Sequence, residues 1–370
     1  MKIEKISPDQ YEEFIKKNDL GYLFLQMPAY ASLYNRFILA GLDDSNSISH
    51  AIIIEPRSAM RFWKYAYSAS GYLSADRTKD HVFLRSVSQW LKQNGFILWR
   101  IESSIEIKEY DKTGAEVDDG FNNHSHLETM QEEGFIWHEI PRGIHTEYQN
   151  TWESVVELKP NVIHDRQGYI GKLQKNKTNY DFEYLLTTMG GSSRKYMRKA
   201  ERDGFSLIVK KPSEMSEQDW KIVEEMIEKS GDFQGFDASD GGKRRELAET
   251  SENNCYLVML LNKEGNVVYG GYWYYTNMEM LCYLGGMNRG AAKYNLASFI
   301  HTNMYKRALE MGLEQYNYGG ISGYFDKTGE GYGCYQFKRE LGAKVIRSFG
   351  VFDQPLSATG RLFEKKISQE

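Results

Sequence analysis

Apolar and polar positions along the chain form two similar series of elements. The first series starts a helix at Ser7, where Pro8 takes the first helical position and Gln10 completes a capping box. The second series starts in the same way at Ser216, again with an aromatic residue four positions after the serine. Apolar residues at helical spacing follow each start, so the pattern predicts an amphipathic helix after both serines.

Segments with the composition of strands follow each of these helices. They cover 51–55 and 62–68 in the first series, and 256–261, 269–275 and 280–284 in the second. A second helix and one more strand come next, at 82–93 and 96–102 in the first series and at 296–311 and 314–318 in the second. Gly95 and Gly312 end the two helices, as in many helix-to-strand connections. We interpret the two series as a duplicated α/β unit, with a chance likeness of short patterns as the alternative.

The length of 370 residues fits two domains, at about 100–200 residues per domain. Turn and polar residues crowd together at 143–157. We therefore expect a first domain over 1–150 and a second over 151–344. The Asn- and Lys-rich stretch 160–180 is predicted to be a polar insertion.

The stretch 111–126 is rich in Asp, Asn and Gly, and it is predicted to be a surface loop. Its two histidines, His124 and His126, are interpreted as solvated residues rather than zinc ligands. No heptad run is long enough for a coiled-coil arm. The sequence thus predicts neither a metal site nor a long helical extension.

Composition limits the functions that the chain can have. Hydrophobic residues make up 41% and charged residues 26%, which excludes a disordered or fibrous protein. The 46 Lys and Arg against 51 Asp and Glu give a net charge of −5, so any contact with nucleic acid needs a local basic patch. The three cysteines lie far apart, and no apolar run reaches the about 18 residues of a membrane span. A location in the reducing cytoplasm is expected.

One basic patch lies at 194–204. Arg194, Arg198 and Arg202 recur at successive turns of the expected helix, with Lys199 beside them. Such a stripe of cations attracts phosphate, and the RNA backbone is its natural partner. The alternative is an ordinary solvated helix face that the neighbouring carboxylates balance.

Two further stretches have residues suited to chemistry. The strand that leads into Tyr318, Gly319 and Gly320 ends in a glycine-rich stretch, where the backbone can approach a ligand closely. It lacks the G-x-G-x-x-G pattern of a dinucleotide site, and a plain turn is the alternative. Lys338 is a residue of the type that can stabilise a developing oxyanion, whereas the alternative for a single lysine on a helix is a solvent-facing side chain.

Five segments, taken together and in order, resemble the Fem family of peptidoglycan-bridge aminoacyltransferases. They are Phe24-Leu25-Gln26 with an aromatic helix expected over 28–37, Trp99-Arg100-Ile101-Glu102, the cluster 198–204, the stretch 316–323, and Phe337-Lys338 with Leu341-Gly342. The resemblance implies two tandem acetyltransferase-like (GNAT-like) α/β domains, with the tail 345–370 returning to the first. It also implies that an aminoacyl-tRNA ester donates its amino acid to an amine of a peptidoglycan precursor.

The resemblance also implies roles for single residues. Lys338 matches the family's functional lysine, which would stabilise the tRNA end or the oxyanion. Glu102 would help to accept the proton, and Tyr283 lies in an aromatic strand beside the acceptor. Arg36 would meet the acceptor's pyrophosphate. The remaining candidates for substrate binding are Lys243, Arg244, Tyr318, Gly319 and Gly320. An aminoacyl ester is already activated, so no cofactor or metal is expected.

The sequence departs from the family pattern at several positions. The usual Arg-Gly-Pro is replaced at 69–72, the usual Asp is Glu102, and the Arg and Tyr expected within 230–243 are absent. The acceptor is therefore left open between a lipid-linked and a UDP-linked precursor, with peripheral association at the inner face of the membrane as one option and no DNA partner. The alternatives are an acyl-CoA-dependent N-acyltransferase, for which 288–292 is a partial pyrophosphate loop, and a non-catalytic tRNA- or precursor-binding protein.

Overall fold

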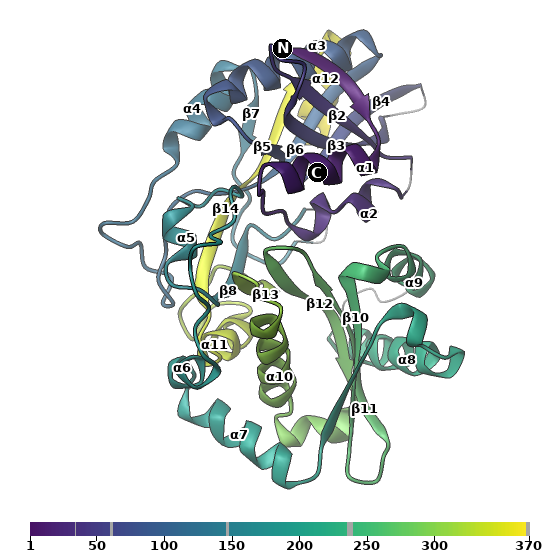
Figure 1. The fold of residues 1–370 in the computed structure, drawn as a ribbon, viewed down its shortest axis with the longest axis vertical. Coiled ribbons are helices and arrows are strands. Elements are labelled where there is room, and N and C mark those ends of the chain that lie inside the picture. The colour runs from purple at the N-terminus through teal and green to yellow at the C-terminus, as the bar shows by residue number, and fades with distance from the viewer. Residues whose placement is uncertain (34, 60–61, 146–147, 235–239, 368–370) are drawn as a thin grey trace.

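The computed structural model describes residues 1–33, 35–59, 62–145, 148–234 and 240–367 (Figure 1). The first half of the chain contains β1 (Lys2–Ile6), α1 (Pro8–Lys17), α2 (Pro28–Ala31), β2 (Phe37–Leu42), β3 (Ile48–Ala59), β4 (Trp63–Ala69), β5 (Tyr72–Ser74), α3 (Asp80–Gln93), β6 (Phe96–Glu106), α4 (His124–Glu132) and β7 (Ile136–His138).

The second half begins with β8 (Trp152–Glu157), α5 (Val162–Asp165), α6 (Phe182–Thr188), α7 (Gly191–Arg202), β9 (Ser206–Lys210), α8 (Glu217–Gln234) and α9 (Gly241–Thr250). It continues with β10 (Cys255–Leu261), β11 (Val267–Tyr275), β12 (Glu279–Met287), α10 (Ala297–Glu310), β13 (Gln315–Gly320), α11 (Tyr332–Glu340), β14 (Lys344–Pro355) and α12 (Ala358–Ile367).

The two halves share one strand topology, which confirms the duplicated α/β unit. In the first half β1, β2, β3 and β4 pair antiparallel, and β4 then pairs parallel with β6 through the crossover helix α3. In the second half β9 to β12 pair antiparallel, and β12 pairs parallel with β13 through α10. Gly95 and Gly312 follow the two crossover helices with φ of 80° and 72°, a conformation that favours glycine.

The β14 strand links the two halves into one sheet (Figure 1). Its first part, from Lys344 to Arg347, pairs with β8, and its second part pairs with β6 and β7. The α12 helix after it packs on β6 and β14. The chain thus returns to its first half at the C-terminal end. The division into domains at residues 150 and 344 stays a prediction.

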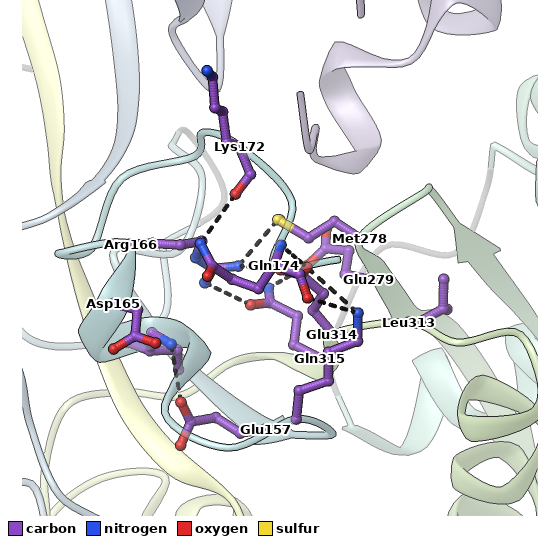
Figure 2. A network of polar contacts seen from close by, with 12 residues as sticks. Glu157, Asp165, Arg166, Lys172, Gln174, Met278, Glu279, Leu313, Glu314 and Gln315 are labelled. Carbon is purple, nitrogen blue, oxygen red and sulfur yellow. Dashed lines mark hydrogen bonds and ion pairs between the residues drawn. The ribbon is translucent and has the colours of Figure 1, made fainter. Parts of the chain in front are cut away.

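The connecting segment 158–181, which contains the stretch 160–180 expected as an insertion, lies against both halves. Gly21 of the first half donates its N–H to the Gly171 carbonyl oxygen at 2.8 Å. Arg166 of the segment donates to the Gln315 side chain of β13, also at 2.8 Å, and Figure 2 shows this contact within a wider polar network. The segment therefore joins the halves through buried polar contacts. Among the described residues the longest helix has 18 residues, and no coiled-coil arm is present.

Two local expectations are wrong. The aromatic helix expected over 28–37 ends at Ala31, and Phe37 already begins β2, because Asn35 takes a left-handed φ of 58° that stops a helix. The surface loop expected over 111–126 gives way to α4 at His124, and His126 is buried rather than solvated. Its ring packs against Phe349 at 5.5 Å between centroids. Apolar burial, not loop composition, decides the place of His126.

Candidate functional site

A cavity of about 100 Å³ lies where the two halves meet, and we call it the central cavity. Its wall comes from β6, β8, β12, β13 and β14 and from the connecting segment. The ionisable residues on the wall are Glu102, Glu106, Glu153, Arg166 and Glu279. Charged side chains are rarely buried without a partner or a function, so this concentration of carboxyl groups marks a candidate site.

Lys338 lies beside this cavity, on α11, and its residue is only 8% exposed. Its ammonium donates to the carbonyl oxygens of Gly319 at 3.1 Å and Gly320 at 2.5 Å. A buried ammonium needs such acceptors because it has lost its water. The alternative of a solvent-facing lysine is therefore wrong, and the two predicted glycines hold the predicted lysine.

These carbonyls are available because β13 leaves its neighbour. The β12 and β13 strands pair over three residues, and the last pair is Leu281 with Asn317. Gly319 follows with a φ of 72°, and Gly320 pairs instead with Glu153 of β8. The divergence of two parallel strands thus opens the sheet next to Lys338.

The Asn317 carboxamide fills the gap between the diverging strands. Its oxygen accepts the Gly319 N–H at 2.7 Å, and its nitrogen donates to the carboxylates of Glu153 and Glu279, both at 3.3 Å. Gln315 donates a further hydrogen bond to Glu279 at 3.0 Å. A single amide therefore joins the turn that holds Lys338 to two carboxyl groups of the central cavity.

The carboxyl groups of the cavity hold protons more tightly than free ones. Burial raises the pKa of Glu106 to about 8, and burial together with Glu279 raises the pKa of Glu153 to about 7. Burial also raises the pKa values of Glu279 and Glu102. Glu106 and Glu153 can exchange protons near neutral pH, as acid–base catalysis requires.

Glu102, the predicted proton acceptor, lies on β6 at the wall of the same cavity. One of its oxygens accepts the main-chain N–H of Gln149 at 2.9 Å, and the residue is 5% exposed. The structure thus places Glu102, from the first half of the chain, at the same cavity as Lys338, from the second half.

Tyr283 protrudes from a β-bulge in β12. Tyr272 pairs with Leu284 and Trp273 pairs with Cys282, which leaves Tyr283 as the extra residue. The bulge turns its side chain outward to 40% exposure. Its ring packs at 5.2 Å from Phe24, whose residue also lines the central cavity. Tyr283 therefore stands at the outer edge of the cavity.

Two predicted phosphate-binding cations lie near Tyr283, and each has a carboxylate partner. Arg36 lies 3.7 Å from the Tyr30 ring and pairs with Glu55 at 2.7 Å. Arg244, whose charge acts on Tyr283, pairs with Glu224 at 2.5 Å. The third, Lys243, is exposed and pairs with Asp240, whose charge also acts on Tyr283. A phosphate at this position would have to share Arg36 and Arg244 with their carboxylates.

A second hollow of about 1250 Å³ lies in the second half of the chain, and we call it the lateral groove. Ser193 and Tyr196 of α7, Leu296 at the start of α10, and Phe337 of α11 are on its wall. Phe337 directly precedes Lys338 in the chain. Lys338 is therefore next to Glu153 of the central cavity, on the helix whose Phe337 lines the lateral groove.

A buried polar and aromatic cluster lies behind Lys338. Tyr318 packs against His301 at 4.8 Å between ring centroids, and the Tyr316 hydroxyl lies 2.8 Å from a His301 ring nitrogen. Burial, with Lys338 nearby, lowers the pKa of His301 to about 3, so His301 is neutral. Tyr318 is 5% exposed and packs within this cluster, and its role in substrate binding stays a prediction.

The predicted basic stripe lies on α7, the helix that also lines the lateral groove. Arg198, Lys199 and Arg202 are exposed, and Arg194 is half-buried with a hydrogen bond to the Leu186 carbonyl oxygen. The alternative for this stripe was a face balanced by neighbouring carboxylates such as Glu201 and Asp203, but no ion pair of these four cations occurs among the described residues. The stripe is thus an open cationic surface beside the groove.

Sequence reasoning missed Glu153, Asn317 and Glu279. Glu153 follows Trp152 in a strand that continues as Ser-Val-Val, and Glu279 precedes Met280 and Leu281. A carboxylate inside or next to an otherwise apolar strand was the available signal, because such positions are costly unless the charge has a use.

Two kinds of feature do not occur in the described part of the chain. No three His, Cys, Asp or Glu side chains there are grouped so that they could hold a metal ion. None of its helices combines the length and the apolar character that a membrane crossing requires.

Comparisons with known proteins agree with the fold. A tandem GNAT protein from the clavulanic acid biosynthesis pathway superposes with a TM-score of 0.53 at 9% identity, covering 96% of this chain and 98% of that one. The crystal structure of FemX superposes with a TM-score of 0.77 at 14% identity over the whole of both chains. The fold is therefore that of two tandem acetyltransferase-like units.

The sequence comparisons identify the family. The FemAB family model matches residues 6–179 and 243–360. The aminoacyltransferase FemA of Staphylococcus aureus is 20% identical over 372 aligned positions, covering 88% of this chain and 87% of FemA. The chain belongs to the FemAB family, and it is an acyltransferase.

Proposed function

We propose that the protein transfers an amino acid from an aminoacyl-tRNA to an amine of a peptidoglycan precursor and so forms a cell-wall bridge or branch. The observation that carries this proposal is the place of Lys338, a buried ammonium that acts on Glu153 of the central cavity and lies on the helix that lines the lateral groove. A transferase that joins two large substrates needs a binding surface on each side of the reacting atoms. Membership in the FemAB family supports the same reaction class.

The donor is assigned to the lateral groove. Tyr196 and Phe337 offer rings on which a nucleobase can stack, and the Arg198 and Arg202 stripe on the same helix suits the phosphate backbone of tRNA. The start of α10 also faces the groove, and the free N–H groups of a helix start favour phosphate. This arrangement would bring the ester of a charged tRNA toward Lys338.

Lys338 would stabilise the reaction intermediate. Attack by an amine on the ester carbonyl creates a tetrahedral oxyanion, and a cation placed there lowers the barrier. An ammonium has three N–H donors, and the carbonyls of Gly319 and Gly320 take two. The third donor is assigned to the oxyanion or to the tRNA end.

The acceptor is assigned to the side of Tyr283 and Phe24. Arg36 and Arg244 lie near this surface, and a precursor pyrophosphate would bind them in competition with Glu55 and Glu224. A lipid-linked precursor would place the reaction at the inner face of the membrane, and a UDP-linked precursor would place it in the cytoplasm.

A transfer assay tests the proposal. The protein is incubated with tRNAs charged with labelled amino acids and with a UDP-linked or lipid-linked pentapeptide, and label in the peptide is measured. We expect amide-bound label with at least one charged tRNA. Acetyl-CoA in place of charged tRNA is the second arm, because the tandem acetyltransferase fold also suits an acyl-CoA donor. Acetylated peptide without aminoacylated peptide would refute the tRNA-dependent function.

A further inference from the structure

The connection between Glu153 and the turn that holds Lys338 has no role in the reaction as proposed so far. The turn of Gly319 and Gly320 holds Lys338, and the Asn317 amide connects that turn with Glu153 at 3.3 Å. Glu153 also pairs in register with Gly320 across β8 and β13. A carboxylate on the cavity wall is thus fixed next to the cation that the reaction uses.

Resting on the proposed function, we propose that the Glu153 carboxylate accepts the proton of the attacking amine, and that Asn317 positions it. Glu153 is half-buried, lines the central cavity, and is within electrostatic reach of Lys338. An acceptor amine that enters from the cavity would therefore meet a proton acceptor and an oxyanion-stabilising cation at one place.

Two other carboxylates of the cavity are less suited to this role. Glu279 is 2% exposed and accepts hydrogen bonds from both Gln315 and Asn317. Glu102 accepts the Gln149 N–H. Glu153 has the Asn317 amide as its hydrogen-bond donor, at a longer distance of 3.3 Å, and this leaves lone pairs for a substrate N–H.

The electrostatic surroundings suit proton transfer at neutral pH. The charge of Glu279 on β12 raises the pKa of Glu153, and the charge of Lys338 on α11 lowers it. Glu153 in turn raises the pKa of Glu106 on β6, in the other half of the chain. Burial and the charge of Glu279 raise the pKa of Glu153 to about 7. A carboxylate with this pKa is a stronger base than an ordinary one and still carries its charge in part at neutral pH.

The chemical step balances without a further reactant. The ammonium of the acceptor gives a proton to Glu153, and the freed nitrogen lone pair forms a C–N bond with the ester carbonyl carbon. The tetrahedral oxyanion then collapses and the bond to the ribose oxygen breaks. Protonated Glu153 gives its proton to that oxygen, and the nitrogen of the new C–N bond releases its one surplus proton to water. The products are an amide and a free tRNA 3′ end.

The test compares Glu153→Gln with a matched control, Glu157→Gln. Glu157 lies on the same strand and the same face, outside the cavity wall, where it pairs with Lys344. Transfer from charged tRNA is measured in single turnovers over a range of pH. We expect Glu153→Gln to slow transfer to the stem-peptide amine by about 100-fold or more. Glu157→Gln should keep the wild-type rate.

A second nucleophile distinguishes an effect of the substitution on proton transfer from an effect on the structure of the site. Hydroxylamine is uncharged at neutral pH, so its attack on the ester needs no base to free the nitrogen. We expect Glu153→Gln to cleave charged tRNA with hydroxylamine at the wild-type rate. The inflection of the transfer rate near pH 7 in the wild type should be lost in Glu153→Gln, where the rate follows the fraction of free amine, and should remain in Glu153→Asp.

Three outcomes would overturn the inference. They are a wild-type rate in Glu153→Gln, an equal loss with both nucleophiles, and an unchanged pH profile. A Glu153→Gln variant that fails to fold leaves Glu153→Asp as the test, since this variant must keep the rise of rate with pH. If the wild type transfers no amino acid at all, the proposed function fails instead, so the two failures are distinguishable.

Discussion

Lys338 and Gly320 are 18 residues apart, yet the Lys338 ammonium donates a hydrogen bond to the Gly320 carbonyl oxygen at 2.5 Å. The contact joins α11 to the end of β13, at the point where β13 has left β12 and pairs with β8. The position of the cation therefore depends on the divergence of the two strands. Its effect on catalysis can be separated from its effect on the fold.

Lys338→Met should lower the transfer rate by about 100- to 1000-fold, the usual effect of removing one oxyanion-stabilising group. Methionine keeps the length of the side chain, so the thermal midpoint and tRNA affinity should change little. Single-turnover transfer and circular dichroism would measure both. Lys306→Met, at an exposed position on α10, is the control. Full activity of Lys338→Met would remove Lys338 from the reaction.

Charge reversal at Arg198 and Arg202 should weaken tRNA binding in a salt-dependent way. If each arginine neutralises one phosphate, the slope of log Kd against log salt should fall by about 2. Filter binding at several salt concentrations would measure it. Reversal at Lys16, an exposed residue of α1, is the control. An identical slope in the double variant and the wild type would contradict a tRNA contact on α7.

Tyr283→Ala should raise the KM for the precursor by about tenfold, or about 1.4 kcal/mol, and leave tRNA affinity unchanged. The reason is that Tyr283 stands on the bulge at the acceptor side, packed against Phe24. Steady-state kinetics with precursor as the varied substrate would show the effect. Tyr184→Ala removes a comparably exposed ring from α6 and should leave KM unchanged. A change in tRNA affinity alone would place Tyr283 on the donor side.

Acid should destabilise the fold through His126. Burial lowers the pKa of His126 from 6.5 to about 4 in the folded state, so the unfolded chain binds the proton first. The stabilisation is complete above pH 6.5 and is lost as the pH falls toward 4, at about 1.4 kcal/mol per pH unit.

The His126→Phe variant tests this effect, since phenylalanine fits the aromatic surroundings of Phe349 and Phe352. The free energy of unfolding by urea, measured between pH 6.5 and 4, should vary less steeply than in the wild type. His124→Phe changes the exposed histidine of the same helix and is the control. Parallel pH curves for His126→Phe and wild type would disprove the linkage.

Asp353→Asn should lower the free energy of unfolding by about 3–5 kcal/mol. Asp353 is fully buried on β14 and accepts two hydrogen bonds from Arg100 of β6, at 2.6 and 2.8 Å. The substitution leaves the Arg100 charge without its partner where the two strands meet. Urea unfolding would measure the loss.

A solvent-exposed ion pair of another β14 residue provides the comparison for Asp353. Arg347 pairs with Glu139, which is 61% exposed, and Glu139→Gln should change the free energy of unfolding by less than about 1 kcal/mol. Equal effects of the two substitutions would show that burial does not set the strength of the Arg100 pair.

The sequence predicted the repeated unit because its signals are local. Ser7 accepts the Gln10 N–H at 3.2 Å, and Ser216 accepts the Asp219 N–H at the same distance, so both helix starts form as expected. Helix caps and terminal glycines act within a few residues, which makes them readable in a linear sequence. The helix expected over 28–37 failed because aromatic content does not distinguish a short helix from the strand that follows it.

The candidate site was predictable only where residue type and local pattern sufficed. The glycine-rich strand end and Lys338 belong to distinctive stretches, and the structure brings them together at 2.5 Å. Glu153 and Glu279 were missed because each is a single carboxylate in an unremarkable stretch. Their importance comes from a shared partner, Asn317, and sequence spacing cannot reveal a partner that is 164 residues away.

The sequence by itself determined the starts of α1 and α8, the glycine stops and the two-fold repetition, since these depend on contacts between near neighbours. The tertiary structure decided which charges are open and which are paired. It left the α7 stripe facing solvent and paired Arg36 with Glu55. It also gathered four carboxylates around one cavity, three of them buried and Glu153 half-buried. Burial and long-range pairing set the pKa of Glu153 and the place of Lys338, and both arise only when distant strands pack together.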